Sequence, residues 1–120
     1  MGMDIYVWRE AVLGSKQNDD GNRETLIRKT DMYRGGGWAI GALLQDTFDL
    51  GNCKQETIDL NRAYEGLKEG AEIFDRNDED AKLEDYQKSL EVLLAVLMEG
   101  REYNSNPDNV YAEYYWELWW

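Results

Sequence analysis

The stretches LNRAYEGLKEGAEIF (residues 60–74) and LEDYQKSLEVLLAVL (residues 83–97) decide the fold, because both repeat apolar side chains at helical spacing. Alternating steps of four and three residues place such side chains on one face of a helix. The sequence therefore predicts helices over 57–75 and 81–99 that pack against each other as an antiparallel pair. The repeating positions are Leu60, Tyr64, Leu67, Ala71 and Phe74, followed by Leu83, Tyr86, Leu90, Leu94 and Leu97.

Polar and small residues mark the limits and the packing of these two helices. The segment NDED (residues 77–80) supplies possible N-caps for the second helix, and Gly100 is a possible C-terminal stop. Within the first helix, Gly66 and Gly70 each cost up to roughly 1 kcal/mol relative to alanine. Their presence predicts close packing against the following helix.

The N-terminal part predicts a β-hairpin followed by a short helix. MDIYVWREAVL (residues 3–13) is rich in β-branched and aromatic residues, and Asp20 and Gly21 suit a tight turn before a return strand over 24–33. After three glycines, WAIGALLQDTF (residues 38–48) is apolar nearly all round at its start, which is typical of a buried helix. We expect Gly51 and Asn52 to end it.

The C-terminal segment VYAEYYWELWW (residues 110–120) has the composition of a strand and is expected to pair with the N-terminal strand. Strand alternation sends Tyr115 and Trp119 to one side and Tyr114, Trp116, Leu118 and Trp120 to the other. The expected fold is α+β and forms a single domain over residues 1–120. A small antiparallel sheet, made from the N-terminal hairpin and the C-terminal strand, packs on the short buried helix and the longer helix pair.

Charge restricts the partners of the chain. Its 13 basic and 25 acidic residues give a net charge of −12, and 17 of the acidic residues lie within residues 56–120. Such a charge repels nucleic acid and anionic membranes, so we expect neither as a direct partner. The single cysteine, and the lack of an apolar run long enough to span a membrane, lead us to expect a cytoplasmic protein.

The residue types needed for common catalytic centres are missing. The chain has no histidine and only one cysteine, Cys53, which removes the usual general base and most transition-metal sites. The acidic loop DRNDEDAKLEDY (residues 75–86) has Asp80 where a calcium loop needs glycine and Tyr86 where it needs glutamate. We therefore expect no enzyme activity, no cofactor and no metal site.

Two groups of residues are candidates for a partner-binding surface. The first is an acidic face on the helix pair, expected to bind a basic protein surface. The second is the aromatic tail, whose members are either core or interface. The acidic face consists of Glu65, Glu69, Glu72, Asp75, Asp78, Glu79 and Asp80, and the tail contributes Tyr115, Trp116, Trp119 and Trp120.

The opening MGMDIYVW (residues 1–8) resembles a group of small, uncharacterised bacterial and phage proteins that begin with MGMD, an aliphatic residue and tyrosine. The resemblance covers these eight residues and a loose arrangement of a glycine-rich turn and two helices. It implies a bacterial or mobile-element origin and assigns no functional residue.

Two hypotheses of different classes follow. The leading one is a non-enzymatic acidic interaction module, in its fullest form a phage or mobile-element inhibitor that imitates DNA and blocks a basic, nucleic-acid-binding surface of a host defence protein. The alternative is a small-ligand-binding domain or minor enzyme with a pocket near Arg34, the glycine loop (residues 35–37) and Trp38. Self-association through the aromatic tail is a third possibility, so a homo-oligomer stays open.

Overall fold

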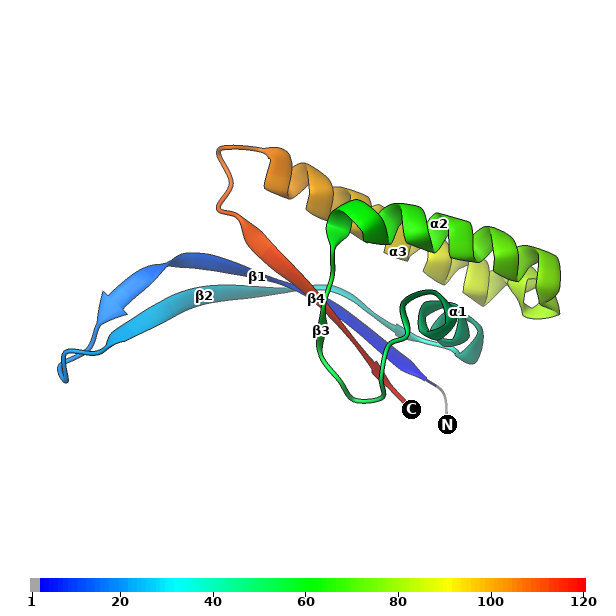
Figure 1. The fold of residues 1–120 in the computed structure, drawn as a ribbon, viewed down its shortest axis with the longest axis horizontal. Coiled ribbons are helices and arrows are strands. Elements are labelled where there is room, and N and C mark those ends of the chain that lie inside the picture. Colours follow the sequence, from blue (N-terminus) through cyan, green and yellow to red (C-terminus); the bar gives the residue numbers. More distant parts are fainter. Residues whose placement is uncertain (1–2) are drawn as a thin grey trace.

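The computed structural model describes residues 3–120 and shows an α+β fold (Figure 1). Its sheet has the strand order β2-β1-β4-β3, and all neighbouring strands run antiparallel. The elements in chain order are β1 (Asp4–Gln17), β2 (Arg23–Gly36), α1 (Trp38–Phe48), β3 (Glu56–Thr57), α2 (Leu60–Asn77), the 3-10 helix η1 (Glu79–Lys82), α3 (Glu84–Ser105) and β4 (Ala112–Trp119).

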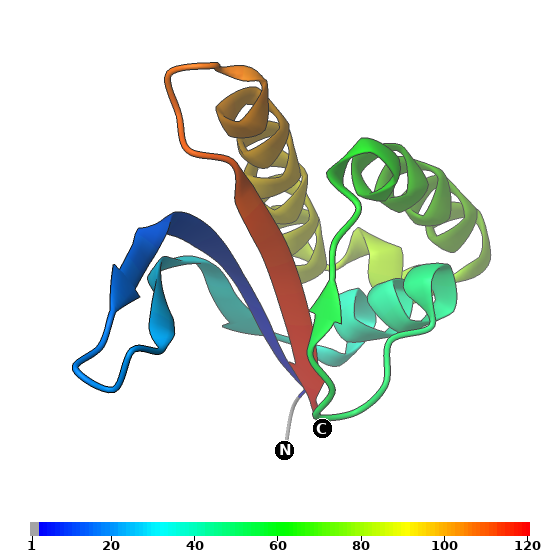
Figure 2. The ribbon, with the colours of Figure 1, turned by 60° about the vertical axis from the view of Figure 1, so that its left-hand side comes forward.

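The helices cover one face of the sheet and enclose the core against it (Figure 2). Alternation along β4 directs Tyr114, Trp116 and Leu118 into this core. The facing helices supply mainly leucines, and no charged residue among residues 3–120 is buried in the core. The helix side of the core includes Ile40, Leu43, Leu44, Leu67, Phe74, Leu93, Val96 and Leu97.

The predicted hairpin is confirmed, and its strands are longer than expected. Gly21 adopts a φ of +84° in the connecting turn, where its N–H donates to the carbonyl of Asn18 at 3.0 Å. Pairing of β1 with β4 stops at Ala11 and Ala112, whereas β1 and β2 continue as a two-stranded ribbon (Figure 1). We call residues 12–29 of this ribbon the arm. All of its residues are exposed.

Helix α1 is confirmed as the short buried helix, with a different end. It stops at Phe48, and Asp49 takes the left-handed conformation with a φ of 54° while its N–H donates to the carbonyl of Gln45. Gly51 and Asn52 therefore lie beyond its end. The first residue, Trp38, is exposed rather than buried, because the inward face begins at Ile40.

The antiparallel pair of long helices is also confirmed, with both members shifted toward the C-terminus. Leu83 was expected on the apolar face but is exposed, because it precedes α3 as its N-cap residue. Leu93 and Val96, which lie outside the predicted repeat, are buried. The inward stripe of α3 is therefore wider than one helical repeat, because the helix packs on both the sheet and α2.

The predicted end of the second helix at Gly100 is wrong. Gly100 lies inside α3, where a Cβ atom would come within 3.1 Å of the Tyr114 ring and 3.2 Å of Leu60. Glycine is needed here for the close approach of helix and strand. The helix continues to Ser105. The side-chain amide of Asn104 donates to the carbonyl of Ala112 and accepts from its N–H, both at 3.0 Å.

The predicted N-cap in the segment NDED belongs to another helix. The carboxylate of Asp78 accepts from the N–H of Asp80 at 2.9 Å and so caps η1, whereas α3 has no side-chain cap. The prediction that the C-terminal strand pairs with the N-terminal one is confirmed over Asp4–Ala11 and Ala112–Trp119. Trp120 follows the end of β4, and it is exposed instead of joining the core.

Candidate functional site

The predicted acidic face lies at the surface, and all seven of its members are exposed. Glu65, Glu69 and Glu72 follow one another at steps of four and three residues along α2 and form one stripe. Asp75 lies farther around the same helix, and Asp78, Glu79 and Asp80 occupy the connection through η1. The helical spacing therefore brings three of the seven residues into a continuous row.

A groove of about 510 Å³ runs between α1 and α2, beside this row. Its apolar lining comes from Ala42, Leu43, Ile73 and Phe74. Ile73 is 54% exposed although it is a large aliphatic residue in an ordered helix. The groove is therefore a place where a partner could cover apolar surface that the fold itself leaves in water.

Gly66 and Gly70 shape the groove by allowing α1 and α2 to approach closely. A Cβ atom on Gly70 would collide with the hydroxyl of Thr47, and one on Gly66 would lie 3.3 Å from the Phe48 ring. The predicted close packing at these glycines is confirmed, but the predicted neighbour is wrong. They pack against α1, which precedes them, and not against α3.

The groove has an acidic border with no basic residue among its lining side chains. Three exposed carboxylates line it. Asp46 belongs to α1, Glu69 belongs to α2, and Asp78 is the C-cap residue of α2. The two ion pairs found among residues 3–120 lie elsewhere and join Arg62 to Asp59 at 3.8 Å and Lys88 to Glu84 at 3.0 Å. The carboxylates at the groove are thus free to face cations of a partner.

The groove and the predicted face overlap only in part. Glu69 and Asp78 belong to both, whereas Glu65, Glu72, Asp75, Glu79 and Asp80 lie outside the groove lining. Asp46 and Ile73 line the groove but are not among the residues predicted from the sequence. Ile73 could have been noticed, because it is an apolar residue outside the apolar repeat of α2. Nothing in the sequence places Asp46 beside α2.

The aromatic tail is divided between core and surface, as the alternation predicted. Trp116 is buried and its ring centroid lies 4.7 Å from that of Phe48. Tyr115 projects from the other face and stacks on Trp8 at a centroid distance of 5.7 Å. Trp119 and Trp120 are 49% and 40% exposed. These two tryptophans are the members of the tail that could contact a partner.

Long basic side chains cover the aromatic residues on the helix-free face of the sheet. Tyr6 stacks on Trp8 at 4.8 Å, and the ammonium of Lys29 lies 4.9 Å from the Trp8 ring. The guanidinium of Arg34 lies 4.9 Å from the Tyr6 ring. Trp8 is consequently only 3% exposed. At Tyr6 and Trp8 this face is shielded by cation–π contacts and does not offer bare rings for stacking.

The residues of the alternative, small-ligand site are divided between two hollows. Arg34 and Gly35 line a hollow of about 500 Å³ together with Asp4 and Glu117. Trp38 lines a separate hollow of about 220 Å³ at the start of α1, whose border includes Asp80 and Asp85. Each hollow carries two carboxylates, which disfavour an anionic ligand at either place.

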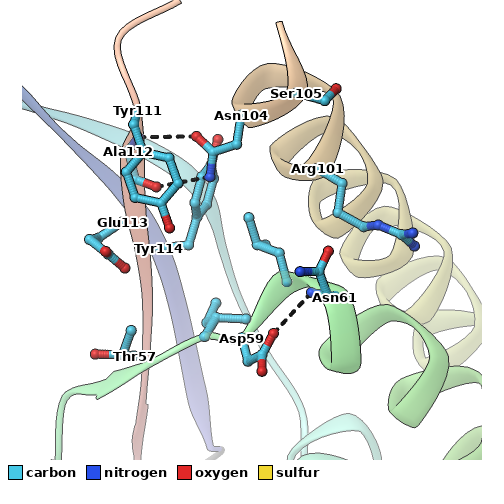
Figure 3. A pocket seen from close by; sticks show the side chains of 12 residues that line it. Thr57, Asp59, Asn61, Arg101, Asn104, Ser105, Tyr111, Ala112, Glu113 and Tyr114 are labelled. Atoms are coloured by element: carbon cyan, nitrogen blue, oxygen red, sulfur yellow. Dashed lines mark hydrogen bonds between the residues drawn. The ribbon is translucent and has the colours of Figure 1, made fainter. Parts of the chain in front are cut away.

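A polar cleft of about 580 Å³ opens between the start of α2, the end of α3 and β4 (Figure 3). The polar side chains of Asn104 and Asp59 in this cleft make hydrogen bonds within the fold. Asn104 binds the backbone of Ala112 through two hydrogen bonds, and Asp59 caps α2 by accepting from the N–H of Asn61 at 3.1 Å. The guanidinium carbon of Arg101 lies 5.7 Å from the centre of the Tyr64 ring. This cleft is therefore explained by structural contacts.

Within residues 3–120, no group of three or more side chains of the metal-binding types is gathered where it could hold an ion. No helix in the same range is long and apolar enough to cross a membrane. Cys53 is exposed, and its thiol donates to the side-chain oxygen of Asn52 at 3.2 Å.

Comparisons of the chain with protein-family models, with curated proteins and with solved structures found no match.

Proposed function

We propose that this protein is a non-enzymatic interaction module that binds a basic protein surface through the groove between α1 and α2. The observation that carries the proposal is the combination of a half-exposed Ile73 with three carboxylates and no cation around it. A partner segment that presents an apolar side chain flanked by lysine or arginine matches both features.

The two features supply different parts of the binding energy. Interfaces are typically apolar at the centre and polar at the rim, with a few central residues carrying most of the affinity. Ile73 lies in the position of such a central contact. The carboxylates of Asp46, Glu69 and Asp78 form the rim, and the net charge of −12 steers basic partners toward it.

In its fuller form, the proposal is an inhibitor encoded by a phage or another mobile element. Such a protein occupies the nucleic-acid-binding surface of a defence protein by partial imitation of DNA. The 18 residues of α2 give it a length of about 27 Å, and duplex DNA of that length carries about 16 phosphate charges. The acidic row on α2 imitates one stretch of such a backbone, and the resemblance of the N-terminal residues supports the origin.

The experiment is capture of partners from a bacterial lysate on the immobilised protein, followed by mass spectrometry and binding measurements with the purified partner. We expect binding to weaken strongly between about 0.05 M and about 0.5 M salt, because exposed charge pairs are screened. Ligand binding in a small apolar pocket would be insensitive to this change. An inhibitor should also displace nucleic acid from the captured protein.

A variant with Glu65, Glu69, Glu72 and Glu79 changed to glutamine tests the acidic face beside the groove, of which Glu69 also lines the groove. Glutamine has a similar helix propensity, so the fold should persist, while the association rate and the salt dependence of binding should fall. The matched control removes four exposed acidic residues elsewhere, namely Glu91, Glu99, Glu102 and Glu113. If both variants lose the same affinity, only net charge matters. Undiminished binding of the first variant at low salt would refute a role for the acidic face.

A further inference from the structure

The arm carries apolar side chains that no other part of the described chain covers. Val12 pairs with Ile27 across the hairpin, and Leu26 pairs with Gly14 one step farther out. Val12, Leu13, Leu26 and Ile27 are each between 44% and 53% exposed. A two-stranded hairpin is marginally stable in water by itself, so an uncovered apolar arm of this length requires an explanation.

The outer edge of β2 is the open edge of this arm. β2 is the terminal strand of the sheet, so no strand pairs with its outer edge along Arg23–Gly36. The opposite edge, on β1, is interrupted by a bulge between Val12 and Gly14, which opposes pairing with another strand. On β2 the next irregularity lies near Met32, which leaves residues 23–31 regular.

Charge makes the arm a region in which two copies of this chain can approach. The arm has four basic and three acidic residues, whereas the rest of the chain has nine basic and 22 acidic residues. Like-charge repulsion between two copies is therefore weakest where they meet through their arms.

We propose that two copies of this protein pair through the β2 edges of their arms, antiparallel and centred on Ile27. The two sheets then join into one continuous sheet across a two-fold axis. This self-association is independent of the groove, and it differs from the self-association through the aromatic tail that the sequence suggested.

The register follows from the limits of the regular segment together with charge, because Ile27 is the midpoint of residues 23–31. A two-fold axis perpendicular to the sheet keeps each face on its own side, so one residue of β2 must oppose its own copy. A centre at Leu26 would set Arg23 against Lys29, and a centre at Arg28 would set that arginine against itself. A centre at Ile27 sets Ile27 against Ile27 and Arg23 against Asp31 twice, with no like charges opposed.

Cross-linking tests both the contact and its register. In a Cys53→Ser background, Ile27→Cys should yield a disulfide-linked dimer under mild oxidation. Directly opposed residues have Cα atoms about 4.5–5.5 Å apart, which lies within the range for a disulfide. Thr25→Cys is the matched control on the same strand and face. In this register its own copy is displaced by four residues, about 13 Å, which is too far for a bond.

Analytical ultracentrifugation gives the second readout. The unmodified chain should show a concentration-dependent dimer, and Ile27→Lys should raise the dimer dissociation constant by about tenfold or more, because two lysines then face each other. Asp19→Asn changes the net charge by the same amount at the turn, outside the paired residues, and should leave the constant within about twofold. Circular dichroism verifies that each variant is folded.

The outcomes separate clearly. A cross-link at position 27 without one at position 25, together with a weakened Ile27→Lys dimer, supports the proposal. A chain that stays monomeric and forms no cross-link at position 27 overturns it and leaves the edge open to a different protein. Equal cross-linking at both positions, or a dimer that Ile27→Lys does not weaken, also overturns it. If Ile27→Lys does not fold, the cross-linking pair decides.

Discussion

At the scale of single residues, Tyr86 is the exception to an otherwise satisfied core. It is buried between α2 and α3, and its ring centroid lies 5.0 Å from that of Phe74. Its hydroxyl is buried without a hydrogen-bond partner among residues 3–120. Burial, with the nearby carboxylates of Asp75 and Asp78 as smaller causes, raises the pKa of Tyr86 above its ordinary value. The hydroxyl therefore costs stability instead of adding to it.

We predict that Tyr86→Phe raises the free energy of unfolding by about 1 kcal/mol, because it removes the desolvation cost of an unpaired hydroxyl and keeps the ring. Urea unfolding at neutral pH measures the change. Tyr114→Phe is the matched control, since the Tyr114 hydroxyl accepts a hydrogen bond from Arg9 at 3.4 Å, and its loss should be neutral or destabilising. Destabilisation by Tyr86→Phe would show that its hydroxyl is in fact paired.

Single residues also show what sequence patterns cannot resolve. Gly66, Gly70 and Gly100 all indicated a special role, but a glycine does not say what approaches it. The partners proved to be Phe48 and Thr47 of α1 and Tyr114 of β4, which come from distant parts of the chain. Leu83 fits the apolar repeat by spacing alone, yet it precedes the first turn of α3 and so lies in solvent.

At the scale of elements, β4 combines two environments in eight residues. Its helix-facing residues are core, whereas its last tryptophan projects beside β1 and remains half exposed. We predict that Trp116→Ala lowers the free energy of unfolding by about 3–5 kcal/mol, as expected for a large buried aromatic residue. Trp119→Ala combined with Trp120→Ala should cost much less, because both side chains keep a large solvent-exposed area.

Chemical denaturation compares these variants under identical conditions. The Trp119 and Trp120 variant should also be tested for binding to any captured partner, since exposed tryptophans are frequent interface anchors. If the double variant is as unstable as Trp116→Ala, these tryptophans are structural and the tail offers no binding surface.

Elements with strong periodicity were predictable, and those that depend on a partner strand were not. The two long helices follow from their apolar repeats, and the hairpin follows from its turn residues. The two-residue strand β3 exists only because it pairs with Trp116 and Tyr115, so no local pattern announces it. The extension of β1 and β2 into the arm likewise depends on their mutual pairing, which carries both strands across a bulge and exposed residues.

At the scale of the whole molecule, the acidic character was readable from composition but the groove was not. Counting charges places the excess in the second half of the chain, and helical spacing places three glutamates in one row. The groove needs Asp46 from α1 beside Glu69 from α2, a proximity that tertiary packing alone creates. The charge pattern was therefore predictable from the sequence, whereas the groove beside it depends on the fold.

Tyrosine ionisation links distant parts of the molecule at alkaline pH. Tyr114 lies in the core, and burial raises its pKa, although a hydrogen bond and positive charge from Arg9 act in the opposite direction. Tyr115 lies on the other face of the same strand, and burial, followed by the carboxylates of Glu10 and Glu113, raises its pKa. Together with Tyr86, three tyrosines from both layers must stay neutral for the fold to keep its full stability.

A raised pKa in the folded state means that the unfolded chain releases its tyrosine protons first. Stability is therefore fully present below about pH 10 and falls as the pH rises above the unfolded value, by at most about 1.4 kcal/mol per pH unit for each tyrosine. Urea midpoints measured from pH 8 to 11 should decline most steeply at the alkaline end.

Lysine deprotonation adds to the decline by making the net charge of the chain more negative, so the comparison must be made between variants. Tyr86→Phe combined with Tyr115→Phe should flatten the decline relative to the unmodified chain, because two of the three groups can no longer ionise. Parallel curves for the two proteins would assign the alkaline loss to general charge repulsion and refute the contribution of Tyr86 and Tyr115.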